Sequence, residues 1–162
     1  IGLEAPDARG LAGIETRSDF KAKRAPHYAM SVRRIQSHGV SVNGCFVLGL
    51  DGQGPDVFDR VIAFVEEEAR PFEVQLTVHT AFPGTPLYER LEREDRLLFP
   101  GRWELCTLFD LNVRLTDMTP RELREGLYRT CERVYSAAAI ERRRAPFHAT
   151  ARRLARRRRC SA

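Results

Sequence analysis

The first 96 residues alternate between short β-rich runs and stretches with the spacing of amphipathic helices. Strands are expected at 1–4, 40–50 and 72–80, and helices at 26–38, at 55–68 and from Thr85 onward. Between residues 17 and 24 the chain is polar, and a loop is predicted there. A repeated strand–helix order is typical of parallel βα units, so the pattern predicts an α/β fold.

The 72–80 strand has one apolar and one polar face. Val74, Leu76 and Val78 share the apolar face, whereas Gln75, Thr77 and His79 share the other. In a closed barrel such a polar face would line a ligand-bearing lumen. In an open sheet it would be a solvated face, and the pattern leaves both possibilities open.

Beyond residue 96 the pattern becomes helical only after an irregular stretch. Thr119, Pro120 and Glu122 form a capping box with proline at the first helical position. The helix that follows is expected to bury one apolar face, made of Leu123, Leu127, Tyr128, Cys131 and Val134. A last helix is predicted from Ala137, fraying into the arginines at 152–159.

The charge of +5 is concentrated at the C-terminal end. Residues 140–162 hold nine Arg and one Glu, whereas the other 139 residues hold 18 Lys and Arg against 21 Asp and Glu. The body is therefore mildly acidic, and the isoelectric point alone does not indicate nucleic-acid binding. Only Phe147 lies among the arginines, so base stacking is not indicated and no nucleic-acid partner is expected.

The four cysteines, at positions 45, 106, 131 and 160, are too far apart for a zinc or iron–sulfur motif. In parallel βα architectures, ligands bind beyond the carboxyl ends of the strands. Here those ends are Glu4, residues 49–54 and residues 79–84. Among the histidines, His79 alone lies at such a position, and no catalytic residue can be assigned from the sequence.

Four segments, in this order and spacing, resemble landmarks of cobalamin-associated radical S-adenosylmethionine proteins. They are IGLEAP at 1–6, IQSHGV at 35–40, GCFVLGLD at 44–51 and PGTPLY at 83–88. Asn112, Met118 and Glu122 with their neighbours resemble the C-terminal extension of that family. The similarity extends over residues 1–136.

The resemblance implies a partial (β/α) barrel of three parallel βα units followed by a C-terminal helical extension. Residues 1–96 would be the C-terminal half of the barrel, 97–140 the extension with its capped helix, and 141–162 an arginine-rich, frayed or disordered tail.

The resemblance also implies a cofactor site. Glu4 would contact the ribose or methionyl part of S-adenosylmethionine, and Arg17 its carboxylate. Val47, Gly49 and Asp51 would lie beside the adenine from one strand, and His79 and Thr80 from the next.

The family's CxxxCxxC loop, which holds the 4Fe-4S cluster, is absent, as is any cobalamin-binding domain. The chain begins with Ile1 as if within a strand, so we expect the natural protein to continue upstream. The cluster and any cobalamin would be bound by that N-terminal remainder, and this chain alone is expected to be inactive.

The implied activity of the whole protein is reductive cleavage of S-adenosylmethionine to a 5′-deoxyadenosyl radical, with cobalamin-dependent methyl transfer or rearrangement of a small-molecule substrate. A cytoplasmic location and no transmembrane segment are expected. Two alternatives stay open: a non-catalytic remnant, and a polyanion-binding module that acts through the arginine-rich tail.

Overall fold

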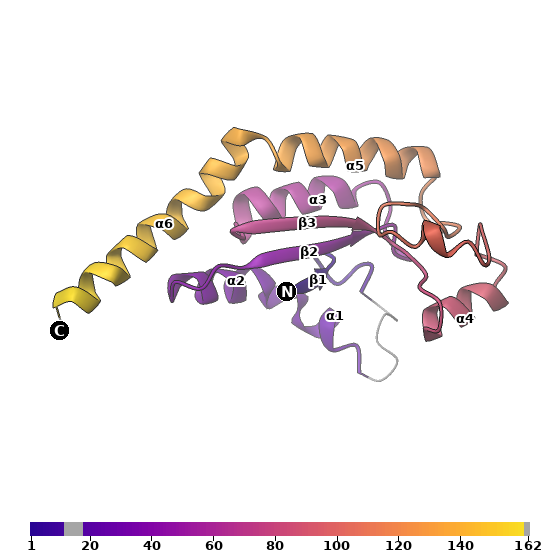
Figure 1. Cartoon of the computed structure of the whole chain (residues 1–162), viewed down its shortest axis with the longest axis horizontal. Coiled ribbons are helices and arrows are strands. Elements are labelled where there is room, and N and C mark those ends of the chain that lie inside the picture. Colours follow the sequence, from indigo (N-terminus) through magenta and orange to yellow (C-terminus); the bar gives the residue numbers. More distant parts are fainter. Residues whose placement is uncertain (12–17, 161–162) are drawn as a thin grey trace.

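A computed structural model describes residues 1–11 and 18–160. Its centre is a sheet of three parallel strands, β1 (Gly2–Glu4), β2 (Asn43–Leu48) and β3 (Glu73–Val78), in the order β1-β2-β3 (Figure 1). The strands alternate with helices and are followed by two C-terminal helices, which confirms the predicted α/β fold of parallel βα units. The sheet is open, so the three βα units do not close into a barrel.

From residue 26 onward the helices agree with the sequence pattern. The helical segments are α1 (Phe20–Arg24), η1 (Ala25–His27), α2 (Tyr28–Ser37), α3 (Val57–Ala63), the π-helix η2 (Phe64–Glu68), α4 (Pro86–Arg93), η3 (Trp103–Leu105), α5 (Pro120–Val134) and α6 (Ala137–Cys160). The prediction of a loop at 17–24 was wrong, because α1 runs directly into η1 and α2. Part of the predicted loop lies outside the described residues.

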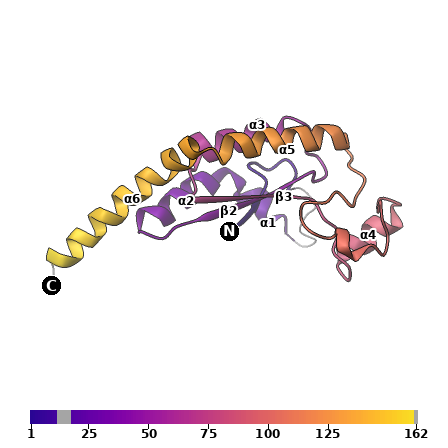
Figure 2. The same cartoon turned by 45° about the horizontal axis from the view of Figure 1, so that its top comes forward.

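Burial alternates along β2, whereas β3 is buried throughout its second half. Phe46 and Leu48 of β2 are buried in the same apolar core as Val74, Leu76 and Val78 of β3. Helices α3 and α5 contribute to that core and lie on one side of β3 (Figures 1 and 2). On the opposite face Gln75 is exposed, whereas Thr77 and His79 are buried. The polar residues of β3 therefore share a face as predicted, but only its first part is solvated.

Helix α5 approaches α3 closely at a glycine. Gly126 is buried, and a Cβ atom at this position would overlap the ring of Phe58, which is 1% exposed. The buried face of α5 therefore runs through Leu123, Gly126, Thr130 and Val134. Tyr128, predicted to belong to this face, is 66% exposed, because it lies on the side of the helix away from α3.

Threonine side chains begin two of the helices, as the sequence predicts. Thr85 accepts a hydrogen bond from the Tyr88 amide (3.2 Å) at the start of α4. At the start of α5 both halves of the capping box are present, between Thr119 and Glu122. Each such cap stabilises a helix by about 1 kcal/mol.

Helix α6 extends away from the sheet as a long arm (Figure 1). It continues to Cys160, through the arginines at which the sequence predicted fraying. Alanine and arginine are strong helix formers, which accounts for this continuation. The predicted domain boundaries at 96 and 140 stay predictions. None of the helices in the described part of the chain has the length and hydrophobicity that crossing a bilayer requires.

The outer edge of β3 is covered by the C-terminal part of the chain. The Val78 amide donates to the Leu108 carbonyl oxygen at 2.7 Å. The Tyr135 hydroxyl donates to the carbonyl oxygen of Val74 at 3.1 Å. These two contacts occupy backbone groups that would otherwise be available to another strand.

We predict that Gly126→Ala destabilises the protein, although alanine favours helices by about 1 kcal/mol over glycine. Overpacking against the buried Phe58 ring costs about 1–3 kcal/mol and should outweigh that gain. Urea unfolding measures the difference. In a Phe58→Leu background, which leaves room for the methyl group, the same substitution should cost less. A Gly126→Ala protein as stable as the original would contradict the close contact.

Candidate functional site

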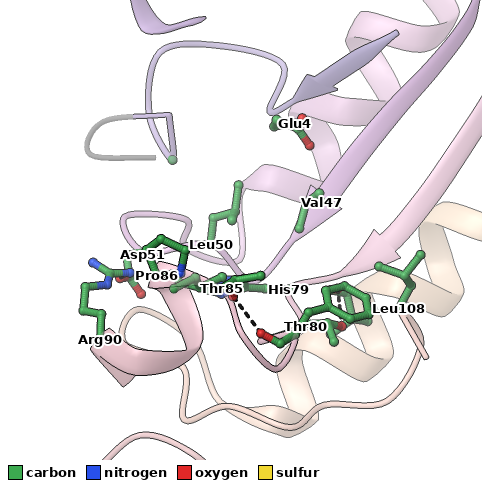
Figure 3. A pocket seen from close by; sticks show the side chains of 14 residues that line it. Glu4, Val47, Leu50, Asp51, His79, Thr80, Thr85, Pro86, Arg90 and Leu108 are labelled. Carbon is green, nitrogen blue, oxygen red and sulfur yellow. Dashed lines mark hydrogen bonds and ion pairs between the residues drawn. The ribbon is translucent and has the colours of Figure 1, made fainter. Parts of the chain in front are cut away.

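The carboxyl ends of all three strands open onto one cavity of about 550 Å³ (Figure 3). Glu4 ends β1, Leu50 and Asp51 follow β2, and His79 and Thr80 follow β3. The cavity is lined by Glu4, Gly10, Val47, Leu50, Asp51, Val78, His79, Thr80, Phe82, Thr85, Pro86, Leu87, Arg90 and Leu108. Its position agrees with the general rule for ligand sites in parallel βα folds.

Most of the residues predicted from the sequence meet in this cavity. Glu4, Val47, Asp51, His79 and Thr80 all line it. Gly49 does not, but its carbonyl oxygen lies 3.2 Å from Nδ1 of His79. Arg17 lies outside the described residues. Whether these side chains bind a cofactor stays a prediction.

The hydrogen bond between His79 and Gly49 fixes the tautomer of the imidazole. A carbonyl oxygen can only accept, so Nδ1 of His79 carries the proton that it donates to Gly49. His79 is 5% exposed, and burial lowers its pKa below the usual value, against the opposing effect of the Asp51 carboxylate. In the neutral ring Nε2 is therefore a hydrogen-bond acceptor, on a side chain that lines the cavity.

Asp51 is held by two arginines that the sequence did not connect with it. Arg96 donates to both carboxylate oxygens, at 2.6 and 3.1 Å, and Arg90 donates at 3.3 Å. The hydrogen bond from Arg96 lowers the pKa of the Asp51 carboxyl group below its usual value. Arg96 also donates to the Arg114 carbonyl oxygen, so this cluster connects the end of β2 to the segment between η3 and α5.

Gln53 organises the turn after β2, and no pattern in the sequence marks it. Its side chain is almost fully buried, at 1% exposed. Its Oε1 accepts from the amides of Gly49 (2.9 Å) and Leu50 (3.2 Å), and its Nε2 donates to the Val47 carbonyl oxygen (3.1 Å). Gly49 has a φ of 90°, which glycine adopts without strain. The turn therefore has a fixed backbone beside the cavity.

Glu4 forms an ion pair with a lysine. Nζ of Lys21 lies 2.6 Å from Oε1 of Glu4, and the carboxylate is 23% exposed. Glu4 has a φ of 65°, a conformation that costs energy in a residue with a side chain. This backbone conformation turns the chain out of the sheet directly after β1.

The cavity combines apolar walls with a few polar groups, as small-molecule sites do. Val47, Leu50, Val78, Leu87 and Leu108 provide the apolar surface. Across residues 1–11 and 18–160, no group of three or more His, Cys, Asp or Glu side chains is placed to hold a metal ion.

Three curated proteins are similar to this chain over part of their length, and no model of a known protein family matches it. The hopanoid C-2 methylase of Rhodopseudomonas palustris is 33% identical over 103 residues, covering 60% of this chain and 18% of that protein. An uncharacterized methyltransferase of Synechocystis is 35% identical over 98 residues, covering 60% and 17%.

The third similar protein is the bacteriochlorophyllide d C-12(1)-methyltransferase of Chlorobaculum tepidum. It is 25% identical over 143 residues, which cover 88% of this chain and 30% of the relative. The chain is thus distantly homologous to proteins named as methyltransferases, and the matched region spans less than a third of each.

We predict that Asp51→Asn lowers the free energy of unfolding at neutral pH by about 1 kcal/mol, since the ion pair is partly exposed. A carboxyl pKa that is lower in the folded state stabilises the fold above its unfolded value, and this contribution is lost as pH falls through the folded value. The difference between the two proteins should therefore shrink below about pH 4. Urea unfolding from pH 7 to pH 3 measures it.

Asp95→Asn is the matched control, because Asp95 is exposed and has a φ of 52°, which asparagine tolerates. Its stability difference from the original protein should stay near zero across the same pH range. A pH-independent loss in Asp51→Asn would contradict the assigned role of the Asp51 charge.

Proposed function

We propose that this chain forms the S-adenosylmethionine and substrate side of the active site of a radical S-adenosylmethionine methyltransferase. The observation that carries the proposal is the meeting of Glu4, Val47 and His79, from three strand ends, in one cavity. The resemblance of the sequence to that family and the partial similarity to proteins named as methyltransferases support it.

The cavity residues fit a nucleoside. Val47, Leu50 and Val78 offer apolar surface to an adenine ring, and Glu4 can accept hydrogen bonds from ribose hydroxyls. Nε2 of His79 can accept a hydrogen bond from an amino group such as that of adenine. When bound, S-adenosylmethionine supplies a methyl group or, after one-electron reduction, a carbon-centred radical.

The residues of this chain do not fit an iron–sulfur cluster. Such a cluster is held by cysteine thiolates, and the described cysteines at 45, 106, 131 and 160 form no such group. We therefore assign the cluster, and cobalamin if it is used, to another part of the natural protein. The proposed role of this chain is to orient the nucleoside and to shield it from water.

A small-molecule methyl acceptor with a largely apolar surface is the substrate class that we propose. Phe82, Leu87 and Leu108 line the cavity and present apolar groups from segments beyond β3. Hopanoid and bacteriochlorophyllide, named for two of the similar proteins, are acceptors of this kind.

We predict that Val47→Phe weakens nucleoside binding about tenfold or more, because the larger ring fills the cavity beside the adenine position. NMR titration of the 162-residue chain with S-adenosylmethionine and with 5′-deoxyadenosine measures the affinity. Val40→Phe is the matched control, since Val40 is 56% exposed and lies outside the cavity lining. Equal affinities for the two variants would contradict this site.

The activity itself is tested on the natural protein, reconstituted anaerobically with iron and sulfide. Release of 5′-deoxyadenosine from S-adenosylmethionine, with methylation of an apolar acceptor, is expected. An iron-loaded, folded protein that neither binds nor cleaves S-adenosylmethionine would overturn the enzymatic proposal and would favour the remnant or polyanion-binding alternatives.

A further inference from the structure

A second groove, of about 400 Å³, lies between α2, the π-helix η2 and α6. Three arginines line it: Arg33 from α2, Arg70 from the segment after η2, and Arg143 from α6. Glu67 also lines it, so its side chains carry a formal net charge of +2. None of its lining residues belongs to the strand-end cavity.

Each of the three guanidinium groups is anchored by a backbone carbonyl oxygen. Arg33 donates to the Glu67 carbonyl at 3.0 Å and Arg70 to the Glu66 carbonyl at 2.9 Å, both in the π-helix. Arg143 donates to the carbonyl of Val134, the last residue of α5, at 2.8 Å. A guanidinium has five N–H donors, so each anchored group keeps further donors.

These arginines lack the carboxylate partners that many others have. Within the described ranges, Arg33, Arg70 and Arg143 form no ion pair within 4.0 Å, whereas Arg60, Arg96 and Arg144 each do. Arg143 is 3% exposed, and its Nε is buried without a hydrogen-bond partner. Arg60 and Arg144 also each have one buried nitrogen without a hydrogen-bond partner, but each of them forms an ion pair, with Asp7 and Glu73 respectively.

A buried cation without a counter-ion is unfavourable. Burial lowers the pKa of the Arg143 guanidinium from its usual value, yet a guanidinium keeps its proton in proteins. The carboxylates of Glu73 and Glu66 oppose this lowering, but both are already paired with other arginines. An anion in the groove would give Arg143 and the two other arginines that line it a counter-charge of their own.

We propose that this groove binds the phosphate group of a small phosphate monoester. A phosphate monoester carries about −2 charges on three strong acceptor oxygens, which matches three guanidinium groups better than a carboxylate does. Thr150 adds a hydroxyl donor, and the ring of Phe147, which contacts that of Phe72 at 4.8 Å, adds apolar surface for the organic part.

The direct test uses the 162-residue chain with inorganic phosphate and with phenyl phosphate as probes, at constant ionic strength. Binding should shift the Nε–Hε NMR signal of Arg143 and raise the melting temperature, and phenyl phosphate should bind more tightly because of Phe147. A response equal to that in chloride would overturn the proposal.

Arg33→Gln and Arg70→Gln should each weaken phosphate binding about tenfold, since each removes a charged hydrogen bond. Arg34→Gln is the matched control, because Arg34 is exposed on the same helix but does not line the groove. It should change the affinity less than twofold.

Equal weakening in all three variants would show general charge screening and contradict a defined site. Tight binding of a single-stranded oligonucleotide that outcompetes phenyl phosphate would also contradict it. Val47→Phe, which blocks the strand-end cavity, should leave phosphate binding unchanged, so the two proposals can fail separately.

Discussion

The unbroken parallel pairing of β2 with β3 is the constraint on which the rest of the molecule depends. The pairing runs from Asn43 opposite Glu73 to Leu48 opposite Val78, and the His79 amide extends it by donating to the Leu48 carbonyl at 2.8 Å. The carboxyl ends of β2 and β3 therefore lie side by side at the same edge of the sheet. The turn at Gly49 and the segment at Thr80 are brought together by backbone pairing before any side chain contributes.

Local patterns in the sequence predicted much of this architecture, because their causes are local. Alternation along β3 follows from the pleat, and the caps at Thr85 and Thr119 follow from the unpaired amides of a helix start. Tyr128 shows where local reasoning fails. Its apolar character suggested burial, but Gly126, which no hydrophobic pattern marks, sets the line along which α3 meets α5.

The candidate site was predictable in its position and less so in its detail. Strand ends such as Glu4 and His79 can be located from periodicity and turn residues. The partnership of Asp51 with Arg96 could not, because it joins residues 45 positions apart through a fold that the sequence does not display. Gln53 was missed for a similar reason, since a buried glutamine that holds a turn has no characteristic spacing.

The concentration of arginine at the C-terminal end conceals two different roles. Arg144 pairs with Glu73 and lies 4.8 Å above the ring of Phe72, so it belongs to the packed body. Arg152 and Arg153, by contrast, are exposed on the arm of α6. A count of arginines does not distinguish them. Burial does, because Arg144 is packed against the body whereas Arg152 and Arg153 are solvated.

The two edge strands of the sheet are not equivalent, and only one of them is free to accept a further strand over its length. Leu108 and Tyr135 engage the backbone of β3 on its outer side, whereas β1 is the last strand on the opposite margin in the described part of the chain. A strand that joined this sheet would therefore enter beside β1. If two copies of the chain associated by edge pairing, β1 of one copy would pair with β1 of the other. Such pairing produces a dimer and not an extended stack of sheets.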